Sequence, residues 1–160
     1  MSQIFNAATV NDEAWRQKII QTAFEWRDTP YQHQASLKGE GCDCLGLIRG
    51  VWRELYGSEP ASPPPYTIDW VERGKVETLK GAAETYLDPI EQSEAQIGDI
   101  LMFRMQPHAV CKHVAIMVSP DSMLHAYWGR AVVESYLIPY WRRRWSYSFA
   151  FPKPSPQSSL

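Results

Sequence analysis

The sequence predicts an α+β fold in which N-terminal helices pack on a C-terminal antiparallel sheet of about five to six strands. Apolar residues recur at helical spacing in the first half of the chain, whereas after Ile97 they form short runs separated by turn residues. A chain of 160 residues with 44% hydrophobic side chains can bury one such core. We therefore expect one domain over residues 1–151, followed over residues 152–160 by a disordered tail rich in proline and serine.

Two helices are predicted before residue 60. The first begins at an Asn11 cap and ends at Asp28-Thr29-Pro30, and its apolar stripe consists of Trp15, Ile19, Ala23 and Trp26. A loop containing two glycines leads to the second helix, whose apolar face starts at Cys44 and whose C-cap is Gly57. Cys44 is therefore expected in the first turn of a helix.

A short third helix is indicated between Leu79 and Leu87, and the strands follow it. The predicted strands are the apolar runs 100–103, 114–118, 123–128, 132–137 and 147–151. Turn residues separate them most clearly at Ser119-Pro120-Asp121-Ser122 and at Gly129-Arg130. Short strands joined by tight turns are typical of an antiparallel meander.

One cysteine and two histidines form a candidate nucleophilic site. The positive end of a helix dipole favours the thiolate, which is the reactive form of a cysteine such as Cys44. His113 opens a predicted strand and can serve as the base, while His125 lies in the next strand, twelve residues further on, with a tight turn about midway. The two histidines should therefore meet across neighbouring strands, where His125 would orient His113.

Charge and hydropathy exclude several other functions. The net charge is -2, so the chain has no general positive field for nucleic acid. The basic segment from Tyr140 to Trp145 is interpreted as a solvated edge beside a strand, with its tryptophans packed beneath. The absence of a signal-like or membrane-length apolar run predicts synthesis in the cytoplasm without membrane insertion.

The cysteines also allow a metal-binding alternative. Cys42, Cys44, Cys111 and His113 could together ligate zinc or an iron-sulfur centre, although their spacings are weaker than paired Cys-x-x-Cys motifs. Otherwise Cys42 and Cys111 are expected to be buried, inert packing residues. His33 and His108 are expected on surface loops.

Five motifs, in order, resemble those of the NlpC-type cell-wall cysteine endopeptidases over about residues 20 to 150. They are Thr29-Pro30-Tyr31, Asp43-Cys44-Leu45-Gly46-Leu47-Ile48, Gly98-Asp99-Ile100-Leu101-Met102-Phe103, His113-Val114-Ala115-Ile116 and Leu124-His125-Ala126. The resemblance implies a papain-like fold and cleavage of peptidoglycan stem peptides, commonly between D-glutamate and a diamino acid. It assigns Cys44 as nucleophile, His113 as base and His125 as the polar third residue, with no cofactor.

The resemblance also implies two residues that bind substrate. Tyr31 would stand beside the nucleophile and help to bind substrate or the oxyanion, and Asp43 would shape the subsite for the amino end of the stem. Two departures are Leu45, where the family usually has Ser, and Gln34-Ala35, where it usually has a pair of glycines.

The amino-acid sequence from Gly41 to Leu47 most resembles that of the subgroup encoded with phage tails and gene transfer agents. This resemblance implies that the enzyme is carried in a phage-like particle, docks on tail-tip or baseplate hub proteins and acts on the recipient's cell wall. One alternative is a tail or baseplate assembly component that docks through the fold or a Cys/His metal centre. The other is a Cys-His amidase or acyltransferase.

For the peptidase, activity should be lost between neutral and mildly acidic pH as His113 becomes protonated.

Overall fold

The computed structural model describes residues 2–60 and 78–154. The elements of these ranges are α1 (Ser2–Phe24), β1 (Ser36–Leu37), β2 (Gly41–Cys42), α2 (Cys44–Tyr56), α4 (Thr78–Tyr86), β3 (Asp88–Ile90), the 3-10 helix η1 (Gln92–Glu94), β4 (Ile100–Arg104), β5 (Cys111–Ser119), β6 (Ser122–Ala126), β7 (Val132–Tyr136), α5 (Pro139–Arg144) and β8 (Trp145–Ala150). Apart from α5, the helices precede the main strands. The predicted α+β class is therefore confirmed.

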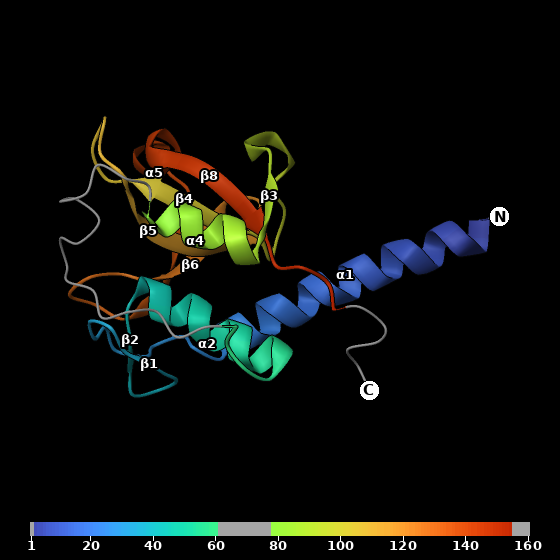
Figure 1. Cartoon of the computed structure of the whole chain (residues 1–160), viewed down its shortest axis with the longest axis horizontal. Helices are drawn as coiled ribbons and strands as arrows, with labels where there is room; N and C mark the ends of the chain where they lie inside the picture. Colours follow the sequence, from blue (N-terminus) through green and yellow to red (C-terminus); the bar gives the residue numbers. More distant parts are fainter. Residues whose placement is uncertain (1, 61–77, 155–160) are drawn as a thin grey trace.

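Six strands form one antiparallel sheet in the order β3-β8-β4-β5-β6-β7. Strands β4 to β7 follow one another as the predicted meander, while β8 returns from the end of the chain to lie between β3 and β4. Figure 1 shows α1 and α2 on one side of this sheet and α5 on the other. The sheet is thus the middle layer of the fold.

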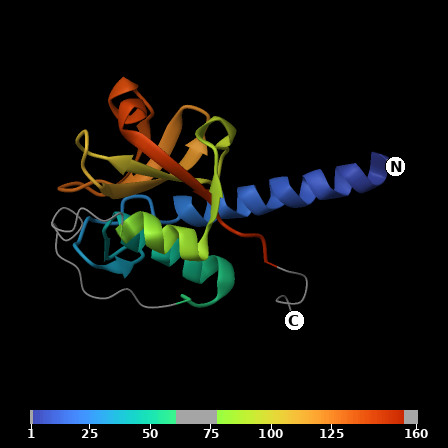
Figure 2. The same cartoon turned by 45° about the horizontal axis from the view of Figure 1, so that its top comes forward.

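Both faces of the sheet are buried, and strand β4 shows how the sequence achieves this. Ile100 and Met102 pack with residues of α1 and α2, whereas the alternate residues Leu101 and Phe103 pack with the tryptophans of the α5 region. Alternate side chains of a strand point to opposite faces, so a strand covered on both sides reads as a continuous apolar run. Figure 2 shows the same arrangement from a second direction.

The first helix differs from the prediction at its N-terminus. It begins at Ser2 rather than after an Asn11 cap, because no proline or glycine interrupts the preceding residues. The predicted stripe of this helix does face the core, since Ile19, Ala23 and Trp26 are buried and Trp15 packs against them. The first turns of α1 extend away from the sheet (Figure 1).

The basic segment forms a short helix, α5, rather than a strand edge. Pro139 occupies its first turn, where a missing N–H costs no hydrogen bond. Trp141 and Trp145 are buried beneath this segment, as predicted, while Arg142 and Arg143 are exposed.

The predicted tail lies outside the described residues from residue 155 onward. Of the helices in residues 2–60 and 78–154, none is both long enough and apolar enough to span a membrane.

Candidate active site

Cys44 is the first residue of α2, so it occupies the predicted first turn of the helix. The backbone N–H groups of this turn have no partner within the helix and point toward the N-terminal end. The Cys44 thiol approaches the start of β5, where its S–H points to the carbonyl oxygen of Lys112, 3.8 Å away. The backbone N–H of Val114 also contacts the sulfur. The thiol therefore meets the main chain on both sides of His113.

Asp43 fixes the position of this thiol by capping the helix. Its Oδ1 accepts a hydrogen bond from the Gly46 N–H at 2.7 Å, and its Oδ2 accepts one from the Gln34 N–H at 2.7 Å. The carboxylate is only 3% exposed, so it ties the loop after Tyr31 to the start of α2. At the other end of the helix, Gly57 is a left-handed C-cap, as predicted.

His113 lies on β5 beside an irregularity in the sheet. Phe103 pairs with His113 and Arg104 pairs with Cys111, so no residue of β4 pairs with Lys112. A bulge of this kind re-aims the neighbouring side chains. The His113 ring stacks on Trp141, with centroids 5.5 Å apart and an interplanar angle of 27°. The irregular strand start and the tryptophan together set the direction of the imidazole.

The two histidines meet as the sequence spacing predicts. His113 Nε2 lies 2.8 Å from His125 Nδ1, across the adjacent strands β5 and β6. His125 is 1% exposed, and its Nε2 lies 2.8 Å from Ser135 Oγ on β7. Because His113 Nε2 is engaged by His125, Nδ1 is the nitrogen that remains for proton exchange with the thiol. Three residues on three neighbouring strands thus form one hydrogen-bonded chain.

Burial favours the uncharged forms of the Cys44 thiol and the His113 imidazole. Burial and then the charge of Asp43 raise the pKa of the Cys44 thiol, although hydrogen bonds from nearby backbone N–H groups oppose that rise. Burial and then the charge of His125 lower the pKa of His113 to about 3. At neutral pH the site therefore holds a thiol beside a neutral imidazole. A neutral imidazole is the form that can accept the thiol proton.

Tyr31 lies near Cys44. Its backbone pairs with Cys42, and its N–H donates to the Arg130 carbonyl at 3.1 Å. Burial, followed by the charge of Cys44, raises the pKa of the half-buried Tyr31 phenol to about 12. The phenol therefore stays protonated and can donate a hydrogen bond.

Two residues of the site were not predicted from the sequence. Ser135 follows an exposed glutamate and precedes an exposed tyrosine, and nothing in its local sequence marks a role. Trp141 belongs to the basic segment from Tyr140 to Trp145, but its contact with His113 depends on where α5 packs. His33 is a half-buried loop residue whose Nδ1 lies 3.9 Å from Asp43 Oδ2, and His108 is exposed on a loop as expected.

The alternative metal centre is not assembled. In residues 2–60 and 78–154 no three His, Cys, Asp or Glu side chains lie together as a metal ligand group, so Cys42, Cys44, Cys111 and His113 do not form one. All three cysteines are free thiols, and Cys42 and Cys111 are fully buried.

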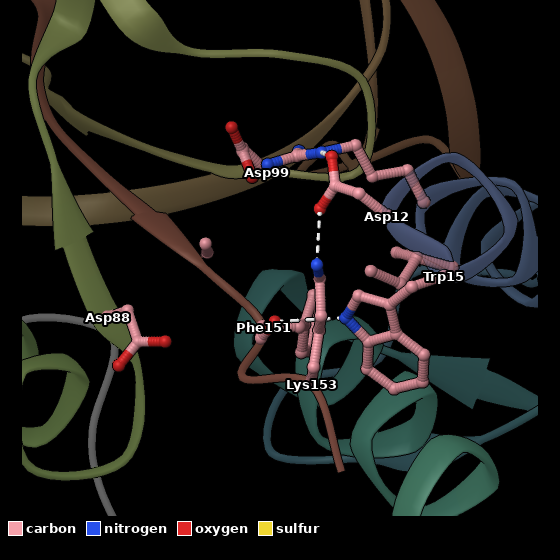
Figure 3. Close-up of a pocket in the computed structure, with 9 residues that line it drawn as sticks. Asp12, Trp15, Asp88, Asp99, Phe151 and Lys153 are labelled. Carbon is pink, nitrogen blue, oxygen red and sulfur yellow. Dashed lines mark hydrogen bonds and ion pairs between the residues drawn. The ribbon is translucent and has the colours of Figure 1, made fainter. Parts of the chain in front are cut away.

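A pocket of about 270 Å³ lies between α1 and the C-terminal segment (Figure 3), and none of the proposed catalytic residues lines it. Its charged groups are largely paired with one another: Asp12 contacts Lys153 at 3.1 Å, and Arg16 donates to Asp99 at 2.8 Å. Asp99 also accepts from the Gln96 N–H at 2.8 Å, so it anchors the turn before β4. These contacts join α1 to the sheet.

Comparisons with known proteins agree with this architecture. The NlpC/P60 family model matches residues 28–149. Similar solved structures, each with a TM-score of 0.60, include a lipoprotein-like NLP/P60 protein from Staphylococcus aureus at 22% identity, the NlpC/P60 domain of the peptidoglycan hydrolase SagA at 21%, and the peptidoglycan hydrolase RipB from Mycobacterium tuberculosis at 16%.

The alignments cover most of this chain but different shares of the other proteins. They include 88% of this chain and 42% of the staphylococcal protein, 84% and 97% for the SagA domain, and 91% and 68% for RipB. The chain thus spans less than half of the staphylococcal protein. The comparison with curated proteins found no match. The predicted papain-like fold is confirmed.

Proposed function

Because this chain belongs to the NlpC/P60 family, we propose that it is a cysteine peptidase that cleaves the stem peptides of peptidoglycan. SagA and RipB, which share its fold, are named as peptidoglycan hydrolases. The observation that carries the proposal is the placement of Cys44 at the start of α2, with its thiol against the main chain on either side of His113.

The proposed reaction has two steps. In the first, His113 takes the thiol proton, Cys44 Sγ bonds to the amide carbon, and the C–N bond breaks as His113 returns the proton to the leaving amine. In the second, His113 removes a proton from water, the resulting hydroxide attacks the thioester, and the C–S bond breaks as His113 returns the proton to Cys44 Sγ. Protons and bonds balance with no further reactant.

The negative oxygen formed in each step needs hydrogen-bond donors. The Cys44 backbone N–H is suited to this role, because it belongs to the first turn of α2 and faces the thiol. The protonated Tyr31 phenol is the second proposed donor. Both donors stand on rigid elements, since Tyr31 pairs with β2 and Cys44 follows the Asp43 cap.

We further propose that the scissile bond joins D-glutamate to a diamino acid and that a phage or gene transfer agent tail delivers the enzyme to the wall. The first suggestion rests on the resemblance in the cysteine and histidine motifs. The second rests on the amino-acid sequence of residues 41–47 and implies docking on tail-tip or baseplate hub proteins.

Digestion of purified peptidoglycan, with the products weighed by mass spectrometry, tests the proposal. We expect fragments cut within the stem peptide, and we expect Cys44→Ala to abolish them. Cys111→Ala is the matched control, since it removes a buried thiol outside the proposed catalytic group. Release of whole stems from the sugar would instead indicate an amidase. Absence of products from a folded wild-type protein would contradict the proposal.

A further inference from the structure

His125 is almost fully enclosed, and the groups around it are mainly aromatic. Its ring lies 5.4 Å from the Tyr127 ring and 5.3 Å from the Trp141 ring, centroid to centroid. Within the described residues, the hydrogen bonds of its side chain go to His113 and to Ser135. A buried ring nitrogen without a partner is costly, so the Ser135 hydroxyl has a specific task here.

The sheet register places Ser135 for this task. Ser135 pairs with Met123 and Val133 pairs with His125, so Ser135 is the diagonal neighbour of His125 on the same face of the sheet. Strand β7 is the edge of the sheet, and Ser135 is half-buried. Its hydroxyl can therefore donate a hydrogen bond to solvent and accept one from the buried His125 Nε2–H.

The direction of the hydrogen-bond chain follows from the chemistry of the base. If His113 Nδ1 is to accept the thiol proton, the proton of neutral His113 must sit on Nε2 and be donated to His125 Nδ1. Neutral His125 must then carry its proton on Nε2, which faces Ser135 Oγ. Ser135 is the acceptor that completes this arrangement.

We infer that Ser135 is a positioning residue of the site, which holds His125 in the tautomer that lets His113 act as a base. The inference rests on the proposed function. The reverse tautomers would place a proton on His113 Nδ1 and block proton transfer from Cys44. Ser135 touches no reacting atom, so its effect passes through two imidazoles.

Ser135→Ala and Ser135→Thr test this role by kinetics on soluble muropeptides. We expect Ser135→Ala to lower kcat by roughly tenfold to a hundredfold, the range found for hydrogen-bond partners of metal-binding histidines, with little change in KM. Ser135→Thr keeps the hydroxyl and suits a strand, so it should restore most of kcat. Ser122→Ala is the control, because Ser122 on β6 bonds Ser119 and Glu134 instead of a histidine.

A spectroscopic measurement gives an answer that does not depend on activity. Nitrogen-15 NMR of the four histidines distinguishes the Nδ1–H and Nε2–H tautomers. We expect Nε2–H signals for His113 and His125 in the wild type and a mixture of tautomers for His125 in Ser135→Ala. An inactive wild type with these signals would reject the proposed function and leave the tautomer assignment standing.

Two outcomes would overturn the inference. One is a Ser135→Ala protein with kcat within about twofold of wild type and unchanged tautomer signals. The other is a Ser122→Ala protein that loses as much kcat and as much thermal stability as Ser135→Ala. Such a result would mean that removal of either hydroxyl acts by destabilising the sheet.

Discussion

His113 Nε2 lies 2.8 Å from His125 Nδ1, and the two ring centroids are 5.1 Å apart on neighbouring strands. Loss of this contact should free the His113 ring and its tautomer. We expect His125→Ala to lower kcat by about a hundredfold or more, in line with other triads whose orienting member is lost. His125→Asn keeps a carbonyl oxygen that can accept from His113 Nε2, so it should retain more activity.

Kinetics on muropeptides, with circular dichroism to confirm folding, provide the measurement. Alanine at position 125 also leaves a cavity, which the asparagine variant reduces. Equal kcat in wild type and His125→Ala would refute an orienting role for His125.

Local sequence signals were sufficient to predict the elements that carry the site. The apolar period after Cys44 and the glycine at position 57 predicted α2, and twelve residues with a central turn predicted the contact between His113 and His125. Each of these signals lies within a few residues of what it determines, and the structure agrees with them.

The remaining parts of the site depend on contacts that the chain forms at a distance. Ser135 reaches His125 only through the β6–β7 register, and Trp141 reaches His113 only after α5 packs on the sheet. The bond from the Gln34 N–H to Asp43 Oδ2 also joins the loop after Tyr31 to the start of α2. No spacing rule within one element predicts contacts of this type.

The pH dependence of activity should differ from the sequence-based expectation. Burial lowers the pKa of His113 from the ordinary 6.5 to about 3, so the base stays neutral through the mildly acidic range. We expect kcat/KM to remain nearly level as the pH falls from about 7 to about 5. Rates measured across this range, on protein shown to be folded at each pH, provide the check. A half-maximal point near 6.5 would contradict the lowered pKa.

Folding stability should depend on pH through His125. Burial lowers its pKa from 6.5 to about 4, so below pH 6.5 the unfolded chain binds a proton that the folded chain excludes. The contribution of His125 to the free energy of unfolding is fully present above pH 6.5 and is lost as the pH falls toward about 4. At that pH the loss amounts to about 3 kcal/mol. Urea unfolding at several pH values should show a shallower pH slope for His125→Asn than for wild type. Equal slopes would mean that His125 is not the group responsible.

Two glycines in helices should respond oppositely to the same substitution. A Cβ atom at Gly50 in α2 would overlap the indole ring of Trp26, which is 1% exposed and donates to Glu54 Oε2 at 3.0 Å. Gly50→Ala should therefore destabilise the fold by about 1–3 kcal/mol. Gly81 in α4 has open space around it, so Gly81→Ala should stabilise by up to about 1 kcal/mol through helix propensity. Denaturant midpoints with unchanged m-values would measure both effects, and a neutral Gly50→Ala would disprove the close packing.

The charge of Asp43 should lower the reactivity of the Cys44 thiol. After burial, this carboxylate is the next cause of the raised pKa of the Cys44 thiol. Asp43→Asn removes the charge, so it should lower the thiol pKa and increase the thiolate fraction at any given pH. We expect the rate of iodoacetamide reaction with Cys44 to rise and its inflection to move to lower pH. Cys42 and Cys111 are fully buried, so Cys44→Ala supplies the background rate.

The same substitution should weaken the fold, because the amide cannot accept from both N–H groups that Asp43 now satisfies. A loss of about 1–3 kcal/mol in unfolding free energy is expected. Asp121→Asn is the control, since Asp121 is 82% exposed and should change neither quantity. A folded Asp43→Asn protein whose Cys44 reacts no faster than wild type would show that the capping carboxylate has no electrostatic influence on the thiol. Faster reaction together with lower stability would show that Asp43 fixes the position of the thiol and also lowers its reactivity.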